Sequence, residues 1–141
     1  MARFALIISA IAILASTSQA HVGITPPTGK PGQSLNASFH VPHGCNGSAT
    51  TSITVSVPDT VVTILPAQVT NWNLTVAYRP LDKPMQVAGQ TINQTVSNFT
   101  WAGGNLPNDQ FQDFPMQITL PQVDLSNQSN VTLYFPTIQT W

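Results

Sequence analysis

The chain has 141 residues, of which 42% are hydrophobic and only 6% are charged, and its formal net charge is −1. This length is typical of a single domain that buries a substantial core. The near-neutral charge excludes a basic surface for nucleic acid, and the sequence has no charged run that would recruit a charged partner.

Residues 1–20 have the organisation of a secretory signal peptide. Arg3 supplies a short positive region, residues 4–15 (FALIISAIAILA) form an apolar run, and Ser18 and Ala20 place small side chains at positions −3 and −1 of a cleavage site. The run of 12 apolar residues is too short to span a bilayer comfortably, and no later segment could cross one. We therefore expect cleavage after Ala20 and a secreted chain, residues 21–141, that begins with His21.

Short runs with an apolar residue at every second position, bounded by Pro, Gly and Asn, predict β-strands. In chain order the apolar sets are Leu35, Ala37, Phe39 and Val41; Ile53, Val55 and Val57; Leu74, Val76 and Tyr78; Phe99 and Trp101; Phe114, Met116, Ile118 and Leu120; and Val131, Leu133 and Phe135. The segments HGCNGS, AGGNLPND and VDLSNQSN predict loops. Trp72 and Trp101 lie within strand patterns and are expected in the core.

Twelve prolines and the lack of helical periodicity argue against long helices. About seven short strands with frequent turn signals predict an all-β fold, a sandwich of two antiparallel sheets in one domain.

Seven N-x-[ST] sequons follow the predicted leader, at Asn36, Asn46, Asn73, Asn93, Asn98, Asn127 and Asn130. One such motif often arises by chance, but seven after a leader favour a secreted eukaryotic glycoprotein. Asn36, Asn73 and Asn98 alternate with the apolar residues of their strands, so we expect them to face solvent. Glycans there would supply solubility that so few charges cannot.

Several segments together resemble one known family. They are HVGITPP, SFHVPHGCNGSATTSITVSVP, NWNLTV, FTWAGGNLPNDQFQDFPMQITLP and LYFPTIQTW, and they cover nearly all of residues 21–141. Their order and content resemble the YcnI-like domain, formerly a domain of unknown function and regarded as a secreted copper-binding module. The resemblance implies an immunoglobulin-like β-sandwich, and it implies that the amine and ring nitrogen of His21 bind one Cu(II) ion in a brace with only one histidine. A copper-transport or copper-delivery protein is the partner that it implies.

The C-terminal end departs from that family pattern in two ways. The family usually has a cysteine after QT, to which a disulfide from the cysteine of VPHGC would be expected. Here Trp141 follows Gln139 and Thr140, so Cys45, the single cysteine, has no partner in the sequence. The family also has a tryptophan near the end of the domain that helps to cover the metal, and Trp141 is a candidate substitute for it.

The chemistry of a mature N-terminal histidine supports copper binding. Its α-amine and Nδ1 close a six-membered chelate ring around one metal ion, and both must be unprotonated. Reference pKa values of about 7.7–8.0 for an α-amine and about 6.5 for imidazole leave little proton competition at neutral pH. Two nitrogens and further oxygen or water ligands suit the tetragonal preference of Cu(II).

Other ligands and other functions stay open at this point. His40 or His43 could complete a two-histidine brace, and Asp109 or Asp113 could offer an oxygen, although each also fits a surface or turn role. A non-catalytic secreted copper-binding protein is our prediction. The alternatives are a copper-dependent polysaccharide mono-oxygenase, which normally needs a second brace histidine, and a metal-free extracellular adhesion or cell-wall module.

Overall fold

The computed structural model describes residues 21–44 and 47–141, so the predicted leader, Cys45 and the sequon asparagine Asn46 lie outside the described residues. The strands are β1 (Gly23–Thr25), β2 (Ser34–Val41), β3 (Thr50–Ser56), β4 (Thr63–Pro66), β5 (Asn73–Val87), β6 (Gln90–Leu106), β7 (Gln112–Thr119) and β8 (Thr137–Thr140). No helix in the described part of the chain is long and apolar enough to cross a membrane.

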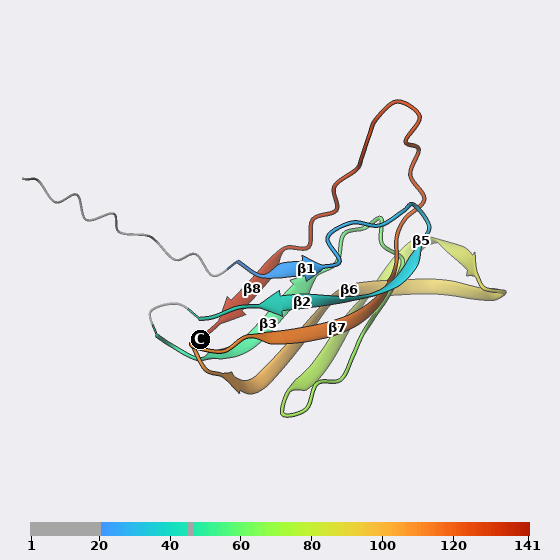
Figure 1. Ribbon diagram of the computed structural model, residues 1–141. Helices are drawn as coiled ribbons and strands as arrows, with labels where there is room; N and C mark the ends of the chain where they lie inside the picture. The colour runs from blue at the N-terminus through green and yellow to red at the C-terminus, as the bar shows by residue number, and fades with distance from the viewer. Residues whose placement is uncertain (1–20, 45–46) are drawn as a thin grey trace, which may run out of the picture.

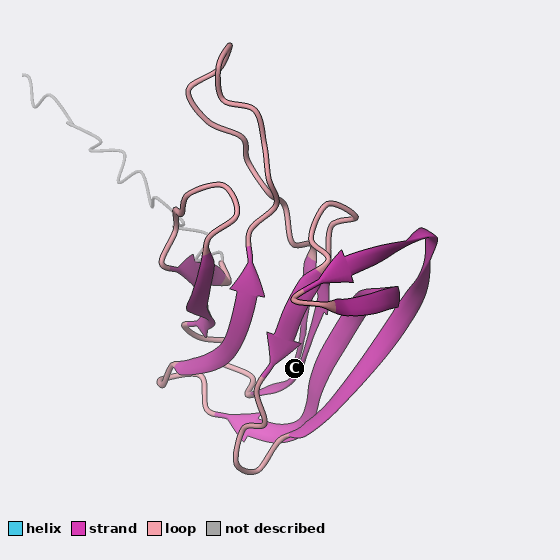
Figure 2. Cartoon of the chain, turned by 90° about the vertical axis from the view of Figure 1, so that its right-hand side faces the viewer, coloured by secondary structure: helices cyan, strands magenta, loops and turns pink. Residues whose placement is uncertain are grey.

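Two four-stranded antiparallel sheets form the molecule, with strand orders β1-β2-β7-β4 and β5-β6-β3-β8. They pack against each other as two layers (Figures 1 and 2). The predicted all-β sandwich is therefore confirmed, with eight strands instead of about seven. Strands β1 and β8 are edge strands, and each pairs with one neighbour only.

The core lies between the sheets because the period-two patterns turn one side chain in two inward. Phe39 on β2, Phe99 and Trp101 on β6, and Phe114 on β7 are almost completely buried. The rings of Phe39, Phe99 and Trp101 lie 5.1–6.3 Å apart between centroids, and the ring of Phe114 lies 5.0 Å from that of Trp101. The Trp101 Nε1–H donates a hydrogen bond to the carbonyl of Ala67 at 2.9 Å, so its one polar group is satisfied.

Two β-bulges change predictions that strict alternation had made. The β5–β6 register shifts between Ala77 and Tyr78, and Tyr78, expected on the core face, is 57% exposed. The segment AGGNLPND was expected to be a loop, but strand β6 continues through Leu106. Its Gly103 has a φ of +78°, which lets β6 bulge beside β3 and resume pairing.

The close packing of Trp72 against this bulge explains why residue 104 is a glycine as well. A Cβ on Gly104 would lie 2.2 Å from the indole ring of Trp72, so only a glycine lets that ring cover the strand. Trp72 is 8% exposed, and its ring meets Phe114 edge-on at 5.0 Å. The predicted core positions of Trp72 and Trp101 are thus confirmed.

The predicted strand at residues 131–135 is wrong. Residues 120–136 form a long connection without strand structure, and β8 starts at Thr137. Leu133 and Phe135 still pack against the core, which explains their apolar alternation, whereas Val131 is 43% exposed. The predicted VDLSNQSN loop is confirmed, and in it the backbone N–H of Ser126 donates to Asp124 Oδ1 at 2.8 Å.

Arg79 on β5 anchors the segment after β3. Its Nη1 and Nη2 donate to the carbonyls of Val57 and Pro58 at 3.0 and 3.1 Å. It also pairs with Asp59 at 3.2 Å, but that carboxylate is 94% exposed. The two carbonyl contacts, and not the ion pair, are therefore the stabilising part of this cluster.

Candidate metal site at His21

His21 is exposed and lies two residues before β1, the edge strand of its sheet. The residues that alternate with it, Val22 and Ile24, pack against the hydrophobic core. This alternation turns the side chains of His21 and Thr25 towards the outer face of the sheet. The predicted ligand is therefore accessible to solvent.

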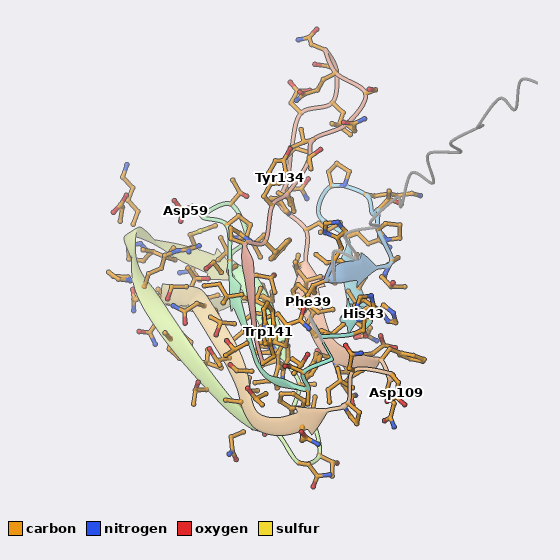
Figure 3. The ribbon with its side chains drawn as sticks, turned by 90° about the vertical axis from the view of Figure 1, so that its left-hand side faces the viewer. Phe39, His43, Asp59, Asp109, Tyr134 and Trp141 are labelled. Carbon is orange, nitrogen blue, oxygen red and sulfur yellow. The ribbon has the colours of Figure 1, made fainter. Side chains whose placement is uncertain are left out.

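Strand directions gather the other candidate residues at the same end of the sandwich. Strands β1 and β7 both run antiparallel to β2, so their starts lie beside the end of β2. The end of β8 lies beside the start of β3, which follows β2 in the chain. Figure 3 shows His43, Asp109 and Trp141 towards this end, away from Asp59 and Tyr134.

His40 and Asp113 form a pair that the sequence did not predict. They are opposite each other on β2 and β7, and His40 Nδ1 lies 2.7 Å from Asp113 Oδ1. An ionised carboxylate only accepts hydrogen bonds, so Nδ1–H donates and Nε2 is left as the unprotonated nitrogen of the neutral ring. Phe111 lies against the imidazole, with 5.1 Å between ring centroids. The signal in the sequence was weak: each residue precedes or follows a core phenylalanine and so faces outward.

His43 has a structural role in the loop after β2. Its Nδ1 donates to the carbonyl of Gly44 at 2.9 Å. Its own carbonyl accepts a hydrogen bond from Gln139 Nε2 at 3.0 Å, and the same amide donates to the buried Thr50 hydroxyl at 2.7 Å. These contacts fix the end of β8 against this loop, and Trp141, which is 53% exposed, follows directly.

Asp109 lies in an exposed turn between β6 and β7. The turn is closed by the backbone N–H of Gln110, which donates to the carbonyl of Pro107 at 3.1 Å. Among the contacts of the described residues, none joins the Asp109 carboxylate to His40 or Asp113. These contacts fit a structural role for Asp109 in the turn better than a role as a metal ligand.

The described residues contain no group of three His, Cys, Asp or Glu side chains that is already gathered as a metal site. The nitrogen donors that the sequence predicts at this end are the imidazole of His21 and, once the chain is cleaved before it, its α-amine. This donor set matches Cu(II) in chemistry, since both donors are nitrogens. The His40–Asp113 pair lies on the outer face of the β1-β2-β7-β4 sheet, and Gly23 of β1 is opposite His40.

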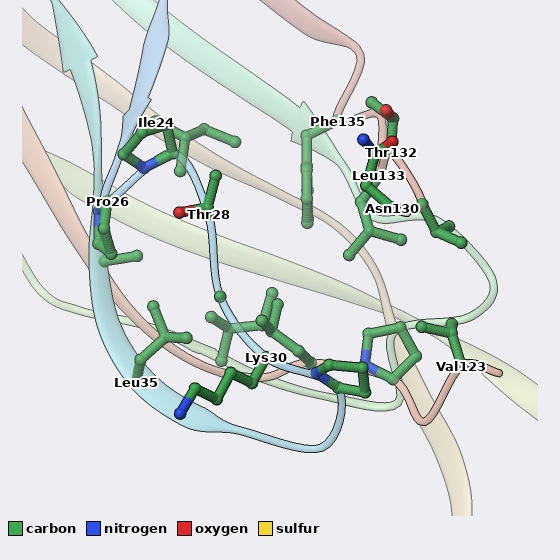
Figure 4. Close-up of a pocket in the computed structure, with 18 of the residues that line it drawn as sticks. Ile24, Pro26, Thr28, Lys30, Leu35, Val123, Asn130, Thr132, Leu133 and Phe135 are labelled. Atoms are coloured by element: carbon green, nitrogen blue, oxygen red, sulfur yellow. The ribbon is translucent and has the colours of Figure 1, made fainter. Parts of the chain in front are cut away.

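A separate apolar groove of about 440 Å³ has His21 outside its lining (Figure 4). It lies between the β1–β2 connection and the long connection before β8, and its lining includes Ile24, Leu35, Leu133 and Phe135. Lys30 is the charged residue of this lining. The groove is lined by Ile24 of β1 and by residues that follow β1, and not by His21.

Comparison with known proteins gives a family and a fold. A family model described as "Domain of unknown function (DUF1775)" matches residues 21–141. A solved structure, an uncharacterized protein from Nocardia farcinica described as having an immunoglobulin-like fold, is 25% identical with a TM-score of 0.58. The match covers 86% of this chain and 78% of that one, which confirms the expected immunoglobulin-like sandwich. No curated protein matches the chain.

Proposed function

This chain belongs to the family of the domain of unknown function DUF1775, and from that premise we propose that it is a secreted, non-catalytic protein that captures or delivers copper. In the proposal, one Cu(II) ion is held by the α-amine and imidazole of His21. The observation that supports this proposal is the position of His21. The family match begins at His21, and this residue is exposed where the chain enters the sandwich at an edge strand.

An edge position suits a chelating N-terminus for two reasons. Packing of Val22 and Ile24 fixes the backbone next to His21, so the chelating residue is tethered but not buried. Both donor nitrogens then stay accessible to a metal ion from solution, whereas burial in an apolar site would disfavour a charged complex. Cleavage before His21 would create the amine, so export and copper binding are coupled.

The secretory part of the proposal is consistent with the exposed sequons. Asn36 on β2 and Asn73 on β5 both face solvent, and Asn93 in the β5–β6 hairpin is exposed as well. Asn98 is half-buried. Mass spectrometry of peptides from the secreted protein should find glycans on Asn36 and Asn73, and unmodified asparagine at both would contradict this part.

Calorimetric titration with Cu(II) tests the copper proposal. The chain secreted from the complete gene, with His21 verified as its first residue by intact mass, should bind one ion. The same chain with one extra residue before His21 converts the amine into a peptide nitrogen and should bind far more weakly, by at least about 100-fold for the loss of one chelate donor. Equal affinity in the two proteins would disprove the amine–imidazole chelate.

One alternative has an observation in its favour. The position of His40 on the same face would suit a copper-dependent polysaccharide mono-oxygenase, since that class uses two histidines. Oxidised oligosaccharides, released from polysaccharide by the copper-loaded chain with a reductant, would favour the enzyme over the carrier. Their absence with a fully loaded protein would favour the carrier.

A further inference from the structure

The imidazole of His40 has the environment of an oriented metal ligand. Asp113 accepts its Nδ1–H at 2.7 Å, and Phe111 lies against its ring at 5.1 Å. A carboxylate that holds one ring nitrogen of a histidine fixes the tautomer and directs the other nitrogen outward, as it does for histidines that bind metals. The His40 side chain is 40% exposed, so Nε2 can reach a solvent-borne ion.

The strand register brings this imidazole close to His21. Residue Gly23 is directly opposite His40 on the neighbouring strand, and His21 is two positions before Gly23. Val22 packs against the core, so His21, although it precedes the paired residues of β1, alternates with Val22 towards the outer face on which His40 lies. In a regular ladder a diagonal pair of this kind is roughly 7–8 Å apart. Two imidazoles can meet at one metal ion across that distance.

Gly23, which is opposite His40 on β1, has no side chain that would cover the outer face there. A Cβ built on Gly23 would meet no other atom within 4 Å, so the outer face directly at Gly23, the residue opposite His40, is open. The donor groups are not yet gathered in the described residues, but His21 is exposed and its side chain can rotate on a nanosecond scale. His40 therefore needs no movement of its own, because Asp113 and Phe111 already hold it.

We propose that His40 Nε2 supplies a third nitrogen to the copper ion held by His21, with Asp113 as the residue that positions the His40 ring. This inference rests on the proposed function and extends it. The brace is then completed by a residue from the neighbouring strand, so that copper links the exposed N-terminal residue to β2. A simple stabilising pair between β2 and β7 is the competing explanation for His40 and Asp113.

Pulsed electron paramagnetic resonance on the unaltered, copper-loaded secreted chain tests the inference without any mutation. Electron spin echo envelope modulation detects the remote nitrogen of each coordinated imidazole, so two coordinated imidazoles are expected. A signal from one imidazole only would overturn the inference.

Three variants identify the residue. His40→Gln should reduce the signal to one imidazole and weaken copper binding by at least about tenfold, and Asp113→Ala should weaken it by about 10–100-fold because the ring loses its orientation. The matched control His43→Gln removes a histidine at the same end and should change neither the signal nor the affinity. Near-ultraviolet circular dichroism of the buried tryptophans verifies that each variant is folded.

The outcomes separate this inference from the proposed function. If the extra residue before His21 abolishes binding while His40→Gln leaves affinity and signal unchanged, the proposed function stands and the inference fails. If His43→Gln removes the second imidazole, the ligand is misassigned and the inference also fails. If the unaltered chain binds no copper, both fail, whereas loss of one imidazole in His40→Gln alone supports the inference and the copper site at His21, and the assay for oxidised oligosaccharides then separates carrier from enzyme.

Discussion

Phe39→Ala tests whether the two sheets share one rigid, dry core. Phe39 is 1% exposed and lies between the layers, with ring neighbours Phe99, Trp101 and Phe135 at centroid distances of 6.0, 6.3 and 6.0 Å. Truncation of a buried phenylalanine to alanine costs about 3–5 kcal/mol through lost burial and the remaining cavity. Phe99 and Trp101 are held on β6 of the opposite sheet, whose strand pairing keeps them from closing over the gap, so we expect the upper half of this range, about 4 kcal/mol.

Urea denaturation followed by tryptophan fluorescence measures this loss, because Trp72 and Trp101 are both buried. The melting temperature should fall by roughly 10–20 °C. Phe111→Ala is the matched control, since Phe111 is 66% exposed, and it should cost less than about 1 kcal/mol. A loss below about 1.5 kcal/mol for Phe39→Ala, or equal losses in the two variants, would refute the reasoning that the inter-sheet layer is closely packed.

Three further predictions concern other parts of the sandwich. Gly104→Ala should destabilise the fold by about 1–3 kcal/mol, because its Cβ would lie 2.2 Å from an indole ring, whereas Gly23→Ala, with nothing within 4 Å, should change stability by less than about 0.5 kcal/mol; similar urea midpoints would contradict this. Arg79→Met should cost about 1.5–3 kcal/mol through two carbonyl contacts, and Asp59→Asn less than about 1 kcal/mol, so a larger loss for the aspartate would reverse our ranking. A backbone hydrogen bond lowers the pKa of Asp124 below 3.8, so its contribution to loop stability is present above the unfolded pKa and is lost as pH falls through the folded pKa; an NMR carboxyl titration with a midpoint at or above 3.8 would show the bond to be absent.

The strands that the sequence predicted correctly are those whose alternation matches burial. On β2, β3 and β7 the apolar positions turn inward without interruption, so period two alone identified Phe39, Val55 and Phe114 as core residues. The pattern misled where the backbone departs from it. A bulge exposes Tyr78, and Leu133 and Phe135 reach the core from a connection that pairs with no strand.

The candidate site was also predicted in part only. Cleavage chemistry and the residue pattern identified His21 as a candidate ligand, because the argument needs only its position in the chain. The sequence kept His40 and Asp113 as two unrelated candidates, since they are 73 residues apart. The β2–β7 register alone places them opposite each other.

The sequence by itself determined the all-β class and the inward residues of the main strands, and it singled out His21 as a candidate ligand, because these depend on local alternation and on residue chemistry. The tertiary structure decided which outward residues meet. Pairing between distant strands put His40 beside Asp113 and opposite Gly23, and tied the end of β8 to the loop of His43 through Gln139. Such meetings depend on long-range register, and no local pattern in a chain encodes register by itself.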